Sequence, residues 1–69
     1  MKPEDVKLRE VLFEFHQVGK AVRVIAIDPR TGIEITMVGA SNYSQEMLKR
    51  LAIRKLRYVI AKRMSEHEN

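Results

Sequence analysis

The sequence predicts an α+β fold: a three-stranded antiparallel β-meander followed by one C-terminal α-helix packed on one sheet face. Three observations predict it. Short segments rich in aromatic and β-branched residues with strand-like patterning occupy residues 10–38, glycine-containing turns divide that stretch, and apolar residues recur at helical spacing through residues 44–64. We expect a single domain over residues 10–64, a mobile N-terminal arm over residues 1–9 and a frayed polar tail over residues 65–69.

The first predicted strand covers residues 10–18, where Val11, Phe13 and Phe15 alternate with residues of the opposite face. Gly19 follows and suits a tight hairpin, because glycine accepts a positive φ without a Cβ clash. The first two strands are therefore expected to be antiparallel neighbours.

The second predicted strand covers residues 21–27 (AVRVIAI), and both of its faces are largely apolar. Only Arg23 favours solvent. A strand that is apolar on both faces is typical of the centre of a sheet, so this strand is expected to be the middle one.

The segment DPRTG, residues 28–32, predicts a second hairpin. Asp28 can accept hydrogen bonds from the backbone amides that follow, Pro29 fixes φ at the first central position, and Gly32 can end the turn in the left-handed conformation. The third predicted strand covers residues 33–38.

The predicted helix covers residues 44–64, with Ser44 as its N-cap; Asn42 and Gln45 form the rival capping pair. The apolar stripe that we expect to dock on the sheet consists of Leu48, Ala52, Leu56, Val59 and Ile60.

One helix covers only one sheet face, which leaves apolar residues without a partner. If Val11, Phe13 and Phe15 face the helix, the uncovered sheet face carries Leu12, Ile25, Ile27 and Val38. A second, narrower apolar strip on the helix consists of Met47, Leu51 and Tyr58. Exposed apolar patches commonly mark contact surfaces, so we expect a homodimer that forms through the sheet face or through this strip.

A chain of this length forms only a small core, so we expect an additional source of stability. A domain of 69 residues buries only about 60% of its unfolded-chain surface, and small domains gain support from disulfides, metals or oligomerisation. The chain has no Cys, which excludes disulfides and the commonest zinc sites. It shows neither an apolar run long enough to span a membrane nor a signal-peptide pattern, so we expect a cytoplasmic protein.

The positive charge is concentrated in the predicted helix. Residues 1–43 carry six basic and six acidic side chains, whereas residues 44–69 carry seven basic and three acidic ones, which accounts for the net charge of +4. The basic face consists of Arg50, Arg54 and Arg57, with Lys49, Lys55, Lys62 and Arg63 as outer contacts. Such a face can bind nucleic acid or an acidic protein, or can simply be solvated.

The segments FEFHQVGKAVRVIAIDPRTGIEITMVGA and LKRLAIRKLRYVI resemble a family of short, uncharacterised bacterial proteins, a domain family of unknown function. The resemblance covers about residues 10–64. Its most specific pieces are the turn at Val18-Gly19, the hairpin from Ala26-Ile27-Asp28 to Thr31-Gly32, and the helix core from Leu51-Ala52 to Arg54-Lys55-Leu56. Ser41-Asn42-Tyr43 stands where a Pro-containing connection is expected, and the resemblance carries over no active site.

Members of that family are sometimes labelled serine hydroxymethyltransferase, an activity that this chain is too small to support. A pyridoxal-phosphate enzyme must bury its cofactor, supply a Schiff-base lysine and bind the phosphate and the pyridinium nitrogen. A chain of 69 residues with three Gly cannot form that pocket, and we expect no cofactor.

Glu14 and His16 are the one pair suggestive of acid-base chemistry, because residues two apart on a strand share a face. No third ligand or nucleophile accompanies them in the sequence pattern, and no small-molecule substrate is indicated. We therefore expect a non-enzymatic, homo-oligomeric protein-interaction module, with nucleic-acid binding by the basic face of the helix as the alternative.

Overall fold

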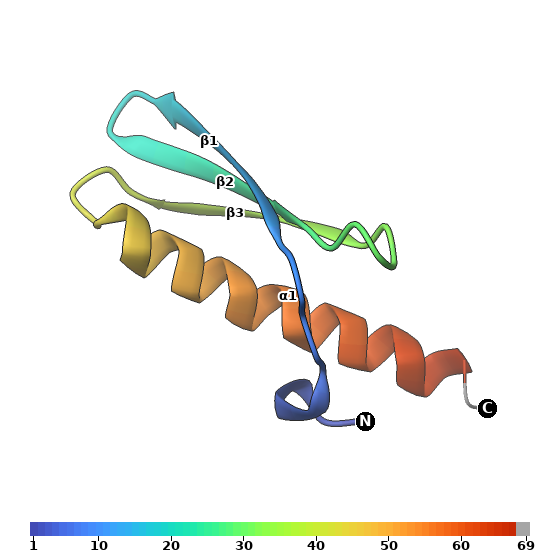
Figure 1. Cartoon of the computed structure of the whole chain (residues 1–69). Helices are drawn as coiled ribbons and strands as arrows, with labels where there is room; N and C mark the ends of the chain where they lie inside the picture. The colour runs from blue at the N-terminus through green and yellow to red at the C-terminus, as the bar shows by residue number, and fades with distance from the viewer. Residues whose placement is uncertain (68–69) are drawn as a thin grey trace.

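The computed structural model of the protein describes residues 1–67 and confirms the predicted order of three strands and one helix. The elements are a 3-10 helix η1 (Pro3–Asp5), β1 (Leu12–Val18), β2 (Ala21–Ile27), β3 (Glu34–Ala40) and α1 (Gln45–His67). The strands form one antiparallel sheet in the order β1-β2-β3, and α1 lies along one face of it (Figure 1).

The strand boundaries follow from the pairing register. β1 begins at Leu12 because Leu12 pairs with Ile27, the last residue of β2, which leaves residues 10–11 without a partner strand. β3 continues past the expected end at Val38, since Gly39 and Ala40 still pair with the first two residues of β2. Sequence alternation locates the strands well, but only the partner strand determines where each one ends.

The core lies between the sheet and α1. Val24 and Ala26 of the central strand are fully buried, as are Ala52 and Leu56 of the helix. Val11, Phe13 and Phe15 pack against this core from the β1 side, so theirs is the face of the sheet that meets the helix. The predicted stripe is also confirmed: Leu48 and Ile60 are buried and Val59 is partly buried.

Ser44 caps the N-terminus of α1. Its Oγ accepts a hydrogen bond of 3.1 Å from the backbone N–H of Met47, which satisfies one of the amides that a helix start leaves unpaired. The helix extends to His67 rather than ending at Met64. Of the predicted tail, residues 65–67 are thus helical, and residues 68–69 lie outside the described residues.

The turn between β2 and β3 is held together by Asp28, which is only 5% exposed. Its carboxylate accepts hydrogen bonds from the Arg30 backbone N–H (3.1 Å) and the Thr31 hydroxyl (2.8 Å). Gly32 has φ 75°, and its N–H donates to the Asp28 carbonyl at 2.8 Å. The expected roles of Asp28 and Gly32 are confirmed.

Replacing Asp28 with alanine is expected to lower the free energy of unfolding by about 1.5 kcal/mol, because two hydrogen bonds to a shielded carboxylate are lost. Chemical denaturation measures the change. The matched control is Arg30→Ala, which alters an exposed side chain and should change stability by less than about 0.5 kcal/mol. Equal effects of the two substitutions would contradict the assigned role of Asp28.

The N-terminal segment packs on the helix, where the sequence led us to expect a mobile arm. Val6 is 7% exposed and belongs to the core, and Leu8 packs against it. The Met1 ammonium donates a hydrogen bond of 3.1 Å to the Ser65 hydroxyl. Figure 1 shows the segment crossing α1 so that η1 lies near the C-terminal half of the helix.

The difference in length between helix and strands explains this packing. α1 has 23 residues and is about 34 Å long, whereas seven-residue strands extend only about 23 Å. The sheet therefore cannot cover the far end of α1, where Ile60 and Ala61 are nevertheless buried. The N-terminal segment covers that end. Within residues 1–67, no helix is both long enough and apolar enough to cross a membrane.

Candidate functional site

The face of the sheet that is turned away from α1, here called the outer face, is not covered by any element within residues 1–67. Its members are Leu12, Glu14, His16 and Val18 of β1, Ala21, Arg23, Ile25 and Ile27 of β2, and Glu34, Thr36, Val38 and Ala40 of β3. Leu12 is 48% exposed and Val38 is 68% exposed. Ile25 and Ile27 are partly exposed and do not belong to the core cluster. All four residues of the predicted sheet contact surface thus lie on the outer face.

The register gives the outer face a mixed pattern of apolar and charged rows. Leu12 lies beside Ile27, and Glu14 lies beside Ile25. Arg23 is flanked by His16 on one side and by Val38 on the other. The acidic and basic side chains of β1 and β2 therefore occupy adjacent rows, with apolar residues around them.

Glu14 and His16 contact one another on this face. His16 Nε2 lies 3.2 Å from Glu14 Oε1. The His16 side chain is 43% exposed and the Glu14 side chain is 56% exposed. Neither residue lines either of the two hollows described below. The pair is accessible to water and lies on an open sheet surface, which is a poor setting for acid-base catalysis.

The second predicted contact surface, the helix strip of Met47, Leu51 and Tyr58, is only partly accessible. Met47 is 41% exposed and Tyr58 is 59% exposed, while Leu51 is half-buried. Tyr58 also lines a hollow on the same side of α1.

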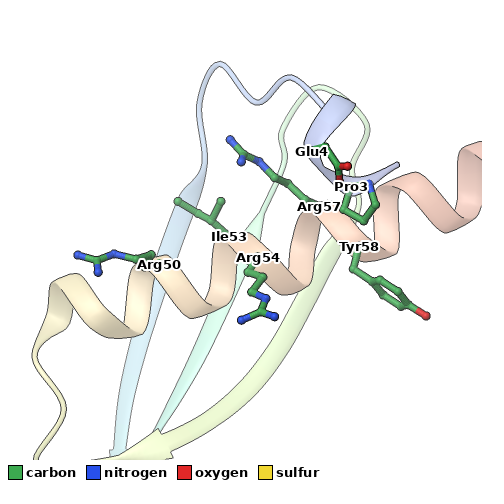
Figure 2. A pocket seen from close by; sticks show the side chains of 7 residues that line it. All are labelled: Pro3, Glu4, Arg50, Ile53, Arg54, Arg57 and Tyr58. Carbon is green, nitrogen blue, oxygen red and sulfur yellow. The ribbon is translucent and has the colours of Figure 1, made fainter. Parts of the chain in front are cut away.

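That hollow has a volume of about 520 Å³ and lies between η1 and α1 (Figure 2). We call it the arginine hollow; its walls are Pro3, Glu4, Arg50, Ile53, Arg54, Arg57 and Tyr58. The structure thus brings the three arginines of the predicted basic face to one hollow. Figure 2 shows that their guanidinium groups point in different directions, with Arg57 directed toward the side of the N-terminal segment.

The charge around the arginine hollow is uncompensated. Within residues 1–67, none of the three arginines forms an ion pair with a carboxylate, although Glu4 lies in the same wall. The Nε of Arg57 is buried and has no hydrogen-bond partner in the part of the chain that the structure describes. A buried donor without an acceptor costs about 1 to 3 kcal/mol, so its presence beside a hollow calls for a physical explanation.

Two of the predicted outer cations are used within the fold. The Lys55 ammonium donates a hydrogen bond of 2.9 Å to the carbonyl of Thr36 on β3. The Lys49 ammonium lies over the Phe13 ring, 5.7 Å from its centroid, a cation–π contact. Lys62 and Arg63 are exposed near the C-terminal end of α1. The seven cations therefore do not form one continuous basic surface.

Sequence reasoning missed Pro3, Glu4 and Ile53 as components of the hollow. Pro3 followed by Glu4 and Asp5 is a helix-start signature, since proline suits the first helical position and acidic residues suit the first turn. That signal could have indicated η1. It could not have indicated that η1 packs against α1, which depends on tertiary structure.

A second hollow of about 270 Å³ lies where the N-terminal segment, the β2–β3 turn and the end of α1 meet. Asp28 is its buried acidic residue, and that carboxylate is already held by Arg30 and Thr31. No group of three or more His, Asp or Glu side chains suited to a metal occurs in the part of the chain that the structure describes. The buried carboxylate of this hollow therefore stabilises the turn between β2 and β3.

Residues 8–63 match a protein family described as a domain of unknown function (DUF6898). The matched range includes the whole sheet and nearly all of α1, whereas Pro3 and Glu4 of the arginine hollow precede it. No curated protein and no solved structure matches the chain.

Proposed function

The chain belongs to this family, a domain of unknown function, and we propose that it acts without catalysis, as a homo-oligomeric interaction module. The partner is a second copy of the chain, which stacks its outer face on the outer face of the first. The observation that carries this proposal is the uncovered sheet face with Leu12, Ile25, Ile27 and Val38 on it.

Burial of these side chains would strengthen a core that is otherwise small. Each apolar Å² removed from water contributes about 25 cal/mol, and sheets with exposed apolar faces typically stack on another sheet. Leu12 at 48% exposure and Val38 at 68% exposure retain much of the area that such stacking would bury.

Charge complementarity favours one orientation of the two copies. If a two-fold axis runs across the strands, each strand lies over its own copy in the antiparallel direction. Because Glu14 and His16 occupy adjacent rows of β1, Glu14 of one copy then lies over His16 of the other, and the contact occurs twice. If the axis runs along the strands, Arg23 would instead lie over Arg23 of the second copy, a repulsive pair.

The size of the outer face limits the affinity. Three strands of seven residues outline a patch of about 23 by 14 Å. That is roughly 330 Å² per copy, well under the ~800 Å² per partner of a standard stable interface. We therefore expect a weak, reversible dimer, whose population depends on protein concentration.

Substituting Val38 with lysine is expected to weaken the dimer by about tenfold or more, because a charge replaces an apolar side chain and is repeated in both copies. The substitution should leave the monomer folded, since Val38 is 68% exposed. Sedimentation equilibrium across a concentration series measures the dissociation constant.

The matched control is Leu51→Lys, which places the same charge on the helix strip. It should leave the dissociation constant within about twofold of the parent value, a change of less than 0.5 kcal/mol. A parent protein that stays monomeric at high micromolar concentration would overturn the proposal. Dissociation by Leu51→Lys and not by Val38→Lys would move the interface to the strip of Met47, Leu51 and Tyr58.

Nucleic-acid binding by the basic face of α1, the alternative raised by the sequence, has less support from the geometry. Lys49 and Lys55 are engaged with Phe13 and with the Thr36 carbonyl, and the guanidinium groups around the hollow diverge (Figure 2). A duplex backbone presents phosphates in a regular row, and neutralising them requires cations in a matching row.

A further inference from the structure

The arginine hollow combines a cavity, an excess of positive charge and a buried donor that is unpaired within residues 1–67. Its three guanidinium groups and the single carboxylate of Glu4 leave two uncompensated positive charges around about 520 Å³. That volume lies within the range of about 300–1,000 Å³ common for small-ligand sites. The charge and the volume together indicate a small dianion.

Arginine is the side chain best suited to phosphate oxygens. Its planar guanidinium donates paired hydrogen bonds, and such charge-assisted bonds are about twice as strong as neutral ones. The buried Nε of Arg57 has no acceptor among the described residues. A turn of this guanidinium toward an anion in the hollow would supply the missing partner and recover the cost of the unpaired donor.

The remaining walls are apolar or aromatic, which indicates that the dianion carries an organic group. Pro3, Ile53 and Tyr58 line the hollow alongside the charged residues. The Tyr58 ring is 59% exposed and offers a flat surface against which an aromatic group can stack.

Glu4 sets a limit on the length of the ligand. Its carboxylate lies in the wall formed by the N-terminal segment (Figure 2), so a second phosphate continuing past the first toward that wall would meet a like charge. We propose that the arginine hollow binds a small phosphate monoester, with Arg57 holding the phosphate, Arg50 and Arg54 adding positive charge around the hollow, and Tyr58 contacting the organic group.

Phenyl phosphate is the probe that tests this site, at constant ionic strength so that general screening does not change. We expect saturable shifts of the NMR signals of the Arg57 Nε–H and the Tyr58 ring, and no shifts with benzyl alcohol, which lacks the charge. Inorganic phosphate should bind more weakly than phenyl phosphate if the organic group contributes.

Three substitutions make the test specific. Arg57→Gln should weaken binding by about tenfold, whereas Arg63→Gln, which removes the same charge from an exposed position of the same helix, should change it by less than about twofold. Glu4→Gln should strengthen binding by about threefold, because it removes the carboxylate that the wall contains within residues 1–67. The folded state of each variant is checked by its backbone amide spectrum.

Shifts that do not saturate, or equal weakening by Arg57→Gln and Arg63→Gln, would overturn the proposal in favour of general charge attraction. Binding of oligonucleotides that strengthens with each added unit would also overturn it, in favour of a polymeric anion. Because Glu4 is an exposed residue, its substitution keeps the proposal testable even if Arg57→Gln perturbs the fold.

Discussion

Replacing Leu56 with alanine is expected to lower the free energy of unfolding by about 3 kcal/mol, the largest effect of any single change considered for this protein. Leu56 is fully buried and is, with Val24, one of the two largest such side chains. Its removal leaves a cavity where α1 meets the sheet. The melting temperature of a domain of this size should fall by about 12–24 °C.

The measurement is thermal or chemical unfolding at one fixed protein concentration, because dimerisation would add a concentration-dependent contribution to stability. The matched control is Met47→Ala on the same helix, where the side chain is 41% exposed and the expected loss is less than about 1 kcal/mol. Losses of equal size at both positions would mean that α1 is not docked on the sheet through the predicted stripe.

The fold could be predicted because local patterns and tertiary packing agree along most of the chain. The alternation through β1, the apolar segment of β2 and the 3.6-residue spacing of α1 each indicate the element that forms. The turn at Asp28 and the cap at Ser44 depend only on nearby backbone groups, so short-range chemistry determines them.

The N-terminal segment could not be predicted in the same way. Val6 and Leu8 are the only large apolar residues between Lys2 and Glu10, too few to indicate order by local composition. Val6 is buried because α1 extends beyond the sheet and offers Ile60 and Ala61 as a surface. That surface exists only after the sheet and the helix have been assembled.

Only part of the arginine hollow could be predicted, because the rest depends on how the N-terminal segment packs after the sheet and the helix have been assembled. Helical spacing correctly places Arg50, Arg54 and Arg57 near one another, but it does not indicate what their side chains contact. Long cationic side chains can reach back over the fold, and Lys49 and Lys55 do so by contacting Phe13 and the Thr36 carbonyl. The hollow itself required η1, which the sequence did not place.

The two proposed surfaces lie on different parts of the molecule. The outer face is the side of the sheet away from α1, whereas the arginine hollow lies between α1 and η1 (Figures 1 and 2). A dimer formed through the outer face would therefore leave the arginine hollow open to solvent. Phosphate-ester binding and dimerisation can accordingly be measured separately, and Val38→Lys should leave the affinity for phenyl phosphate unchanged.

Replacing Gly39 with alanine is expected to lower the free energy of unfolding by about 2 kcal/mol, because the added methyl group overpacks the core. A Cβ at Gly39 would clash with the Cδ2 atom of Leu48, and Leu48 is only 3% exposed. The absence of a side chain at Gly39 therefore allows the start of α1 to approach β3 closely. Equilibrium unfolding in denaturant measures the loss.

A double-mutant cycle identifies the clash as the cause. Leu48→Ala removes the opposing side chain, so the double variant should lose at least about 1 kcal/mol less than the sum of the two single losses. Gly32→Ala is the matched control: Gly32 has φ 75° and open space around it, so its cost is backbone strain, which Leu48→Ala cannot relieve. Additive losses for Gly39→Ala and Leu48→Ala would mean that the two residues are not in contact, and the close approach of α1 to β3 would then be wrong.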